Sequence, residues 1–98
     1  MMRPQEILEE IESHFGLEPG DLRSRSRIAH IVKARQITAW IFRQEEYSLE
    51  AIGNALARDH STVAHMLKRV KQNELLWWEA SRIKKRIITN PDYSVVYL

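Results

Sequence analysis

The stretch LEAIGNALARDHSTVAHML, residues 49–67, decides the fold of this chain. Two helices that cross steeply through a tight turn need a small residue where their backbones approach, and Gly53 provides one. Ala57 falls at the turn, and β-branched Val63 would anchor the second helix against the first. This spacing is typical of a helix-turn-helix, although an ordinary helix pair that packs closely at Gly53 would show it equally well.

The start of the second helix carries short polar side chains, which are poor core material. With Val63 turned inward, they are Arg58 and Asp59 just before the helix and His60, Ser61, Thr62 and His65 in its first two turns. Hydroxyls and imidazoles can bond to base edges in the major groove of DNA, and free backbone N–H groups at a helix start favour a phosphate. Asp59 is also expected to cap the helix. This chemistry favours a DNA-recognition helix.

The rest of the chain predicts an all-α fold, a small bundle of about five helices that contains the helix-turn-helix. Helices are expected at about residues 4–15, 28–45, 48–56, 59–72 and 74–88, from apolar periodicity and the Pro, Gly, Ser and Asp residues at their ends. The predicted core positions are Ile7, Leu8, Ile11 and Phe15, then Ile31, Ala34, Ile37 or Thr38, and Ile41, then Val63, Leu67 and Val70, then Leu75, Leu76, Ile83 and Ile87. We expect one domain over residues 1–90 and a tail over 91–98.

The charge is unevenly distributed, although the net charge is only +2. Residues 1–20 hold one arginine against five glutamates, whereas residues 21–86 hold fourteen of the 15 Lys and Arg against seven acidic residues. The excess of basic residues over 21–86 suits a polyanionic partner, although many charged surfaces are merely solvated.

The sequence shows neither a membrane span nor a signal peptide, so a cytoplasmic, nucleoid-associated protein with no membrane partner is expected.

No arrangement of residues indicates an enzyme. The chain lacks cysteine, which excludes disulfides and thiolate chemistry. His60 and His65 are five residues apart and do not share a helical face as metal ligands would. The acidic cluster Glu9, Glu10 and Glu12 is expected on the solvated side of the first helix. We therefore predict no enzymatic activity, cofactor, metal site or small-molecule substrate.

Three tryptophans give the main alternative. Trp40, Trp77 and Trp78, with the basic cluster Arg82, Lys84, Lys85 and Arg86, could stack on single-stranded nucleic acid, contact a protein, or form a solvated basic face. Adjacent helical residues cannot both face inward, so at least one of Trp77 and Trp78 should be exposed. The alternative function is accordingly a helical protein-protein interaction module that uses the Trp77-Trp78 surface and the C-terminal tail.

Residues Arg58 to His65 resemble the signature R-D-H-[ST]-T-V-x-H of the C-terminal DNA-binding domain of the bacterial replication initiator DnaA. The similarity includes residues 33–37 and 49–53 and the basic loop at 23–27, and it covers about residues 5–88. The resemblance implies sequence-preferring binding of double-stranded DNA at a DnaA-box-like site. The chain would act as a replication, transcription or mobile-element accessory.

The resemblance also implies a role for each matching residue. Base edges would be read by Asp59, His60, Ser61 and Thr62. The minor groove would receive Lys33 and Arg25. Contacts to the DNA backbone, which set register without specifying sequence, would come from Arg23, Arg27, Arg35, Gln36, Ser48, Leu49, Arg58, His65 and Lys68.

Three departures from the family pattern matter. Where the family usually has a glycine pair before the Arg-Asp-His string, this chain has Leu56-Ala57 and a turn shorter by one residue, so a changed docking angle is expected. Lys33 stands where many members carry arginine, and lysine is a less geometrically demanding cation. The chain contains no G-x-x-x-x-G-K-[ST] phosphate loop, so no ATPase activity is expected.

Overall fold

The computed structural model describes residues 2–88, which form five α-helices and one 3₁₀ turn and contain no strand. The elements are α1 (Pro4–Phe15), η1 (Asp21–Arg23), α2 (Ala29–Gln44), α3 (Leu49–Leu56), α4 (His60–Gln72) and α5 (Glu74–Ile88). The predicted all-α bundle of about five helices is confirmed over this range. The tail at 91–98, on which part of the interaction-module hypothesis depends, lies outside the described residues.

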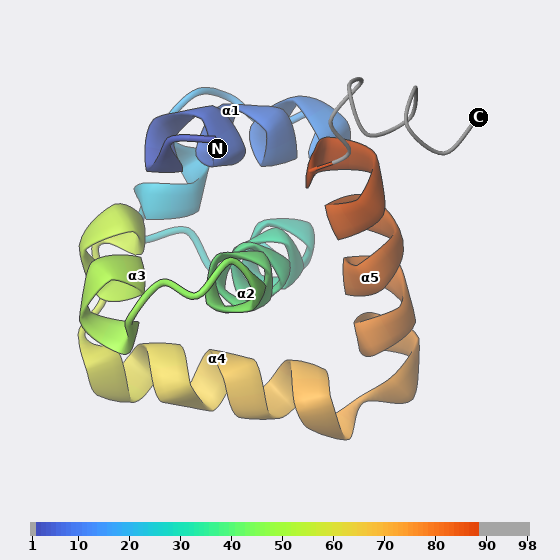
Figure 1. The fold of residues 1–98 in the computed structure, drawn as a ribbon. Coiled ribbons are helices and arrows are strands. Elements are labelled where there is room, and N and C mark those ends of the chain that lie inside the picture. Colours follow the sequence, from blue (N-terminus) through green and yellow to red (C-terminus); the bar gives the residue numbers. More distant parts are fainter. Residues whose placement is uncertain (1, 89–98) are drawn as a thin grey trace.

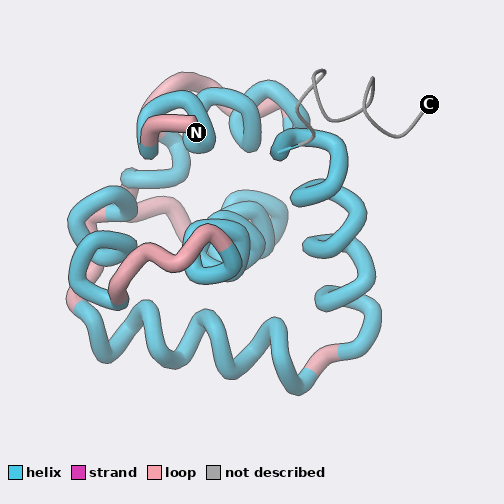
Figure 2. Tube along the Cα trace, in the orientation of Figure 1, coloured by secondary structure: helices cyan, strands magenta, loops and turns pink. Residues whose placement is uncertain are grey.

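Helix α2 is the axis of the bundle. Figure 1 views it nearly end-on, with α1, α3, α4 and α5 arranged around it, and each of these helices contacts α2. Figure 2 shows short loops at the corners between α3 and α4 and between α4 and α5, whereas the loops at the two ends of α2 run between this frame and its centre. The predicted stripe on α2 is buried throughout, and the hydroxyl of Thr38 donates to the carbonyl of Ala34 at 2.7 Å, so its burial leaves no unsatisfied polar atom.

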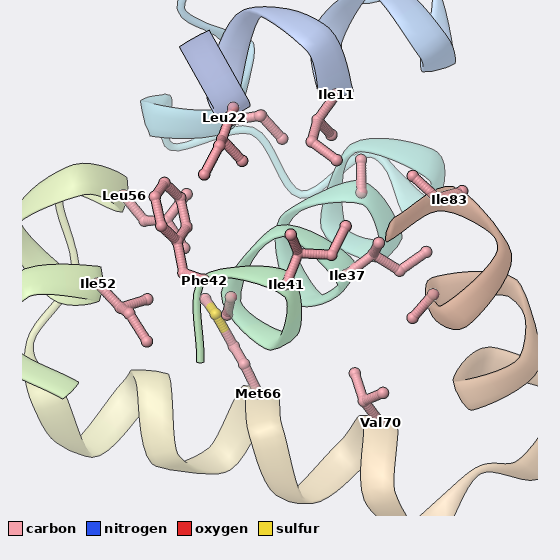
Figure 3. Packing of buried hydrophobic residues seen from close by; sticks show 14 of the residues in the cluster. Ile11, Leu22, Ile37, Ile41, Phe42, Ile52, Leu56, Met66, Val70 and Ile83 are labelled. Carbon is pink, nitrogen blue, oxygen red and sulfur yellow. The ribbon is translucent and has the colours of Figure 1, made fainter. Parts of the chain in front are cut away.

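The core fills the space between α2 and the surrounding helices (Figure 3). Four core predictions need correction. Phe15 on α1 and Ile87 on α5 pack against the core but are only partly buried. On α4 the buried residue between Val63 and Val70 is Met66, whereas Leu67 is only partly buried. On α5 Leu76 is buried but Leu75 is 81% exposed, because adjacent helical residues point about 100° apart and only one can face α2.

Side-chain caps fix the starts of the two helices that matter most for function. The hydroxyl of Ser48 accepts the N–H of Ala51 at 3.0 Å at the start of α3, and the Asp59 carboxylate accepts the N–H of Thr62 at 2.8 Å at the start of α4. Both caps confirm the predicted helix starts.

Glu12 was expected on the solvated face of α1, but its side chain is buried. The burial is tolerated because the Glu12 carboxylate accepts the backbone N–H of Gly20 at 2.8 Å.

Candidate nucleic-acid interface

Helix α3 and the turn that precedes α4 pack more closely than any side chain at position 53 would permit. A Cβ atom added to Gly53 would overlap the backbone carbonyl oxygen of Arg58, and the Arg58 N–H donates to the Gly53 carbonyl at 2.9 Å. Ala57 closes the turn in the left-handed conformation, with φ of 55°. The predicted close approach at Gly53 is therefore confirmed, and the turn is compact.

The start of α4 presents polar side chains to solvent. Val63 is fully buried against the bundle, whereas His60 and Ser61 are exposed and Thr62 is half-buried. The inward orientation predicted for Val63 is therefore correct, and the neighbouring polar side chains point away from the core. No acidic side chain other than the capping Asp59 belongs to α4 or its N-cap.

The same exposed face continues along α4 as a shallow hollow. Its lining consists of His65, Lys68, Arg69 and Gln72. The sequence prediction included the first two residues and missed Arg69 and Gln72. Arg69 follows His65 by four positions, and Gln72 follows Lys68 by four. This spacing indicates from the sequence that these residues share one face of the helix. The face therefore combines polar groups at its start with two cations further along.

Asp59 has a structural role at this site. The hydrogen bond from the Thr62 backbone N–H is the main reason that the pKa of Asp59 is lowered below its ordinary value. The carboxylate therefore stays ionised well below neutral pH. Because the pKa is lowered on folding, the contribution of this cap to stability is present above the unfolded-state pKa and is lost as the pH falls through the lowered value.

The basic loop before α2 is held in place by a buried arginine. Arg35 is 4% exposed, and its Nε donates to the Leu22 carbonyl at 2.9 Å. Its Nη atoms donate to three further carbonyls, those of Asp21, Ser24 and Ser26, at 3.0 to 3.4 Å. Burial and the nearby charge of Arg58 lower the pKa of Arg35. Arg35 was expected to contact the DNA backbone, and its guanidinium lies inside the fold with its donors on loop carbonyls.

Two more arginines join this loop to the helix-turn-helix. Arg58 donates to the Ser24 carbonyl at 2.6 Å and to the carbonyls of Leu56 and Ala57 at 3.1 Å. Arg23 donates to the carbonyls of Asn54 and Ala55, both at 3.1 Å. These carbonyls lie at the C-terminal end of α3, where the last carbonyl oxygens of a helix receive no N–H donor from their own helix. Both arginines, which were predicted to contact DNA, thus join the loop to the helix-turn-helix. Arg23 remains exposed, as do Arg25 and Arg27.

Lys33 lies in the second turn of α2 and is already paired. Its Nζ is 3.0 Å from a carboxylate oxygen of Glu79 on α5, and its side chain is 44% exposed. Such exposed pairs contribute little to stability, so the lysine can exchange its partner. Gln36 is half-buried and borders the same hollow as Arg27 and Lys33.

The start of α3 supplies the remaining predicted contacts. Ser48 is exposed and Leu49 is half-buried. As the first residue of α3, Leu49 has a backbone N–H without an acceptor in its own helix, which is the kind of donor that binds phosphate.

Two further properties concern the described part of the chain, residues 2–88. None of its helices is both long enough and apolar enough to cross a membrane. The same residues contain no group of three His, Cys, Asp or Glu side chains placed to hold a metal ion.

Comparison with known proteins gives a consistent result. Residues 4–70 match the family model described as the bacterial dnaA protein helix-turn-helix. Chromosomal replication initiator proteins DnaA from a Thermoanaerobacter species and from Chloroflexus aurantiacus are 36% identical over 86 residues and 37% identical over 87 residues. A third, from Campylobacter curvus, is 30% identical over 91 residues.

These alignments cover most of this chain but little of the relatives. They include 83% of this chain in the first two cases and 87% in the third, but only 19%, 18% and 21% of the respective DnaA proteins. The chain thus spans about a fifth of the length of these relatives.

Proposed function

Since this chain belongs to the bacterial DnaA helix-turn-helix family, we propose that it binds double-stranded DNA at DnaA-box-like sites through the start of α4. The observation that carries the proposal is the orientation of α4. Val63 is fully buried while His60 and Ser61 are exposed beside it. Hydroxyl and imidazole groups on a protruding helix start match the hydrogen-bonding pattern of the major groove.

The proposed roles follow the position of each side chain. Asp59, His60, Ser61 and Thr62 read bases, with Asp59 doing so through the carboxylate oxygen that does not cap α4. Arg25 and Lys33 enter the minor groove. The phosphate contacts come from Arg27, Gln36, Ser48, Leu49, His65 and Lys68, while Arg23, Arg35 and Arg58 hold the basic loop in position.

The proposed cellular role is that of a DNA-binding accessory in replication, transcription or a mobile element. The relatives that carry the replication-initiator name are about five times longer, and no phosphate-loop motif occurs in the sequence of this chain. The proposed activity is therefore DNA binding without ATP hydrolysis.

Selection of bound duplexes from a random library at near-physiological salt tests the proposal directly. We expect a DnaA-box-like consensus, since the residues matching the family's base-reading positions are nearly unchanged. Salt must be fixed, because the phosphate contribution to affinity depends steeply on it. A pool that stays random after several rounds would overturn the proposal.

Releasing Lys33 is expected to strengthen duplex binding. In Glu79→Gln the amide cannot hold the Lys33 ammonium as an ion pair, so the lysine becomes available to DNA. Affinity should rise by about two- to five-fold, the equivalent of one exposed ion pair. Fluorescence anisotropy with a labelled duplex would measure the change.

A matched control separates the lysine from a general charge effect. Glu74→Gln removes the same charge from the same helix but breaks no ion pair given by the structure. It should change affinity less than Glu79→Gln does. In a Lys33→Ala background the advantage of Glu79→Gln over Glu74→Gln should disappear, and an undiminished advantage would exclude Lys33 from the interface.

A further inference from the structure

The three tryptophans of the chain line one surface groove between α2 and α5. Trp40 comes from α2, and Trp77 and Trp78 come from α5. The groove has a volume of about 580 Å³. Its other lining residues are Gln44, Ser81, Arg82, Lys84, Lys85 and Ile88. The surface predicted from the Trp77-Trp78 pair therefore includes a third tryptophan.

The rings touch edge to face, which leaves ring surface open to a ligand. Trp40 and Trp77 have centroids 6.5 Å apart at 77°, and Trp77 and Trp78 have centroids 5.4 Å apart at 80°. Trp77 remains 41% exposed and Trp78 55% exposed. Two adjacent tryptophans with this exposure form an apolar surface that a partner can cover.

The charge of the groove favours an anionic partner. Its lining contains three cationic side chains and, among the residues that the structure describes, no carboxylate. Glu79, on the same helix, is paired with Lys33 and does not line the groove. A negatively charged chain would therefore meet attraction along the whole groove.

We propose that this groove binds single-stranded nucleic acid, with bases stacked on Trp77 and Trp78 and phosphates on Arg82 and Lys84. Aromatic faces combined with cations are the arrangement that binds unpaired bases without sequence preference. A groove for an amphipathic protein helix would instead present rows of aliphatic side chains, and among residues 2–88 Ile88 is the only aliphatic residue in this lining. The Gln44 and Ser81 side chains add polar groups that can bond to base edges.

The groove lies apart from the start of α4, which is the proposed base-reading surface. Figure 1 shows α3 and α5 on opposite sides of α2, and the start of α4 adjoins α3. A bound duplex at the helix-turn-helix and a single strand on α5 would occupy different faces, so binding at one can be measured while the other is disabled.

Tryptophan fluorescence provides a selective signal, because every tryptophan of the chain lines the groove. Titration with an oligothymidylate or oligouridylate of about 12 nucleotides, within the range that one small domain covers, should quench the emission. The two oligomers distinguish DNA from RNA as the bound strand. Unchanged emission with both at near-physiological salt would overturn the proposal.

Variants of the groove define the contacts. Trp78→Ala should weaken binding of a dye-labelled oligomer by roughly five- to 150-fold, the loss of one stacked base, whereas Trp78→Phe should retain most of the affinity. Arg82→Gln with Lys84→Gln should weaken binding and flatten its salt dependence. Circular dichroism checks that each variant is folded. Equal affinities of Trp78→Ala and the unmodified protein would refute stacking at this site.

The two binding proposals can fail separately. His60→Ala with Thr62→Ala should leave quenching by the oligomer unchanged, and Trp78→Ala should leave duplex affinity unchanged. If instead an acidic peptide rich in aromatic residues quenches the emission and the oligomers do not, the groove is a protein-docking site and the single-strand assignment is wrong.

Discussion

Replacing Gly53 with alanine is expected to lower the free energy of unfolding by about 3 kcal/mol, at the upper end for an overpacked interior. The added Cβ would overlap the Arg58 carbonyl oxygen, a backbone atom that no rotamer change can move away. Helix α3 and the turn that carries Arg58 would have to separate, which also displaces the start of α4. Thermal unfolding should show a melting temperature lower by more than about 10 °C, and duplex binding should weaken with it.

The opposite exchange in the same turn provides the control. Ala57 has a φ of 55°, a left-handed conformation that costs an L-residue with a Cβ about 1 kcal/mol and glycine almost nothing. Ala57→Gly should therefore raise the free energy of unfolding by up to about 1 kcal/mol. Two substitutions four residues apart thus have opposite signs. A Gly53→Ala variant as stable as the unmodified protein would show that the helices do not approach as closely as described.

Features governed by local sequence could be predicted from the sequence. Ser48 and Asp59 cap helices through N–H groups three residues away, and Gly53 contacts a residue five positions later. The apolar periodicity of α2 determined its buried face, because a helix surrounded by other helices must be apolar along its length. These interactions depend on neighbours in sequence, so spacing and residue type are sufficient to find them.

The roles of the arginines could not be predicted in this way. Arg35 and Arg58 were assigned to the DNA backbone because the resemblance to the DnaA C-terminal domain implied that role for these positions. In the fold, the Arg58 guanidinium donates to Ser24, 34 positions away, and Arg35 donates to carbonyls nine to fourteen positions away. The partners Lys33 and Glu79 are still further apart in sequence, by 46 positions. Such partners depend on tertiary packing, which no local pattern encodes.

The hydrogen bonds of Arg35 and Arg58 also determine how the contact surfaces of the candidate site are held. The loop that carries Arg25 and Arg27 is tied to α2 by Arg35 and to the helix-turn-helix by Arg58. Minor-groove and major-groove contacts would then be held in a fixed relation before DNA arrives. A preorganised pair of contact surfaces loses less conformational freedom on binding, which raises affinity without adding contacts.

Loss of sequence discrimination is the expected result of the double substitution His60→Ala with Thr62→Ala. Each base contact contributes about 1–3 kcal/mol of discrimination, so the preference for a selected duplex over a scrambled one should fall by at least about 30-fold. Competition measured by anisotropy at fixed salt would record the change. His60 is exposed and Thr62 is half-buried, so thermal stability should change little.

The matched variant neutralises two cations that are proposed to touch the DNA backbone or minor groove. Arg25→Gln with Arg27→Gln should weaken binding to selected and scrambled duplexes alike, and the slope of log affinity against log salt should decrease by about two. Neither guanidinium holds the fold together through any hydrogen bond that the structure gives, so the loop should keep its shape. If the His60 and Thr62 pair instead caused equal losses on both duplexes, the start of α4 would not be the base-reading surface.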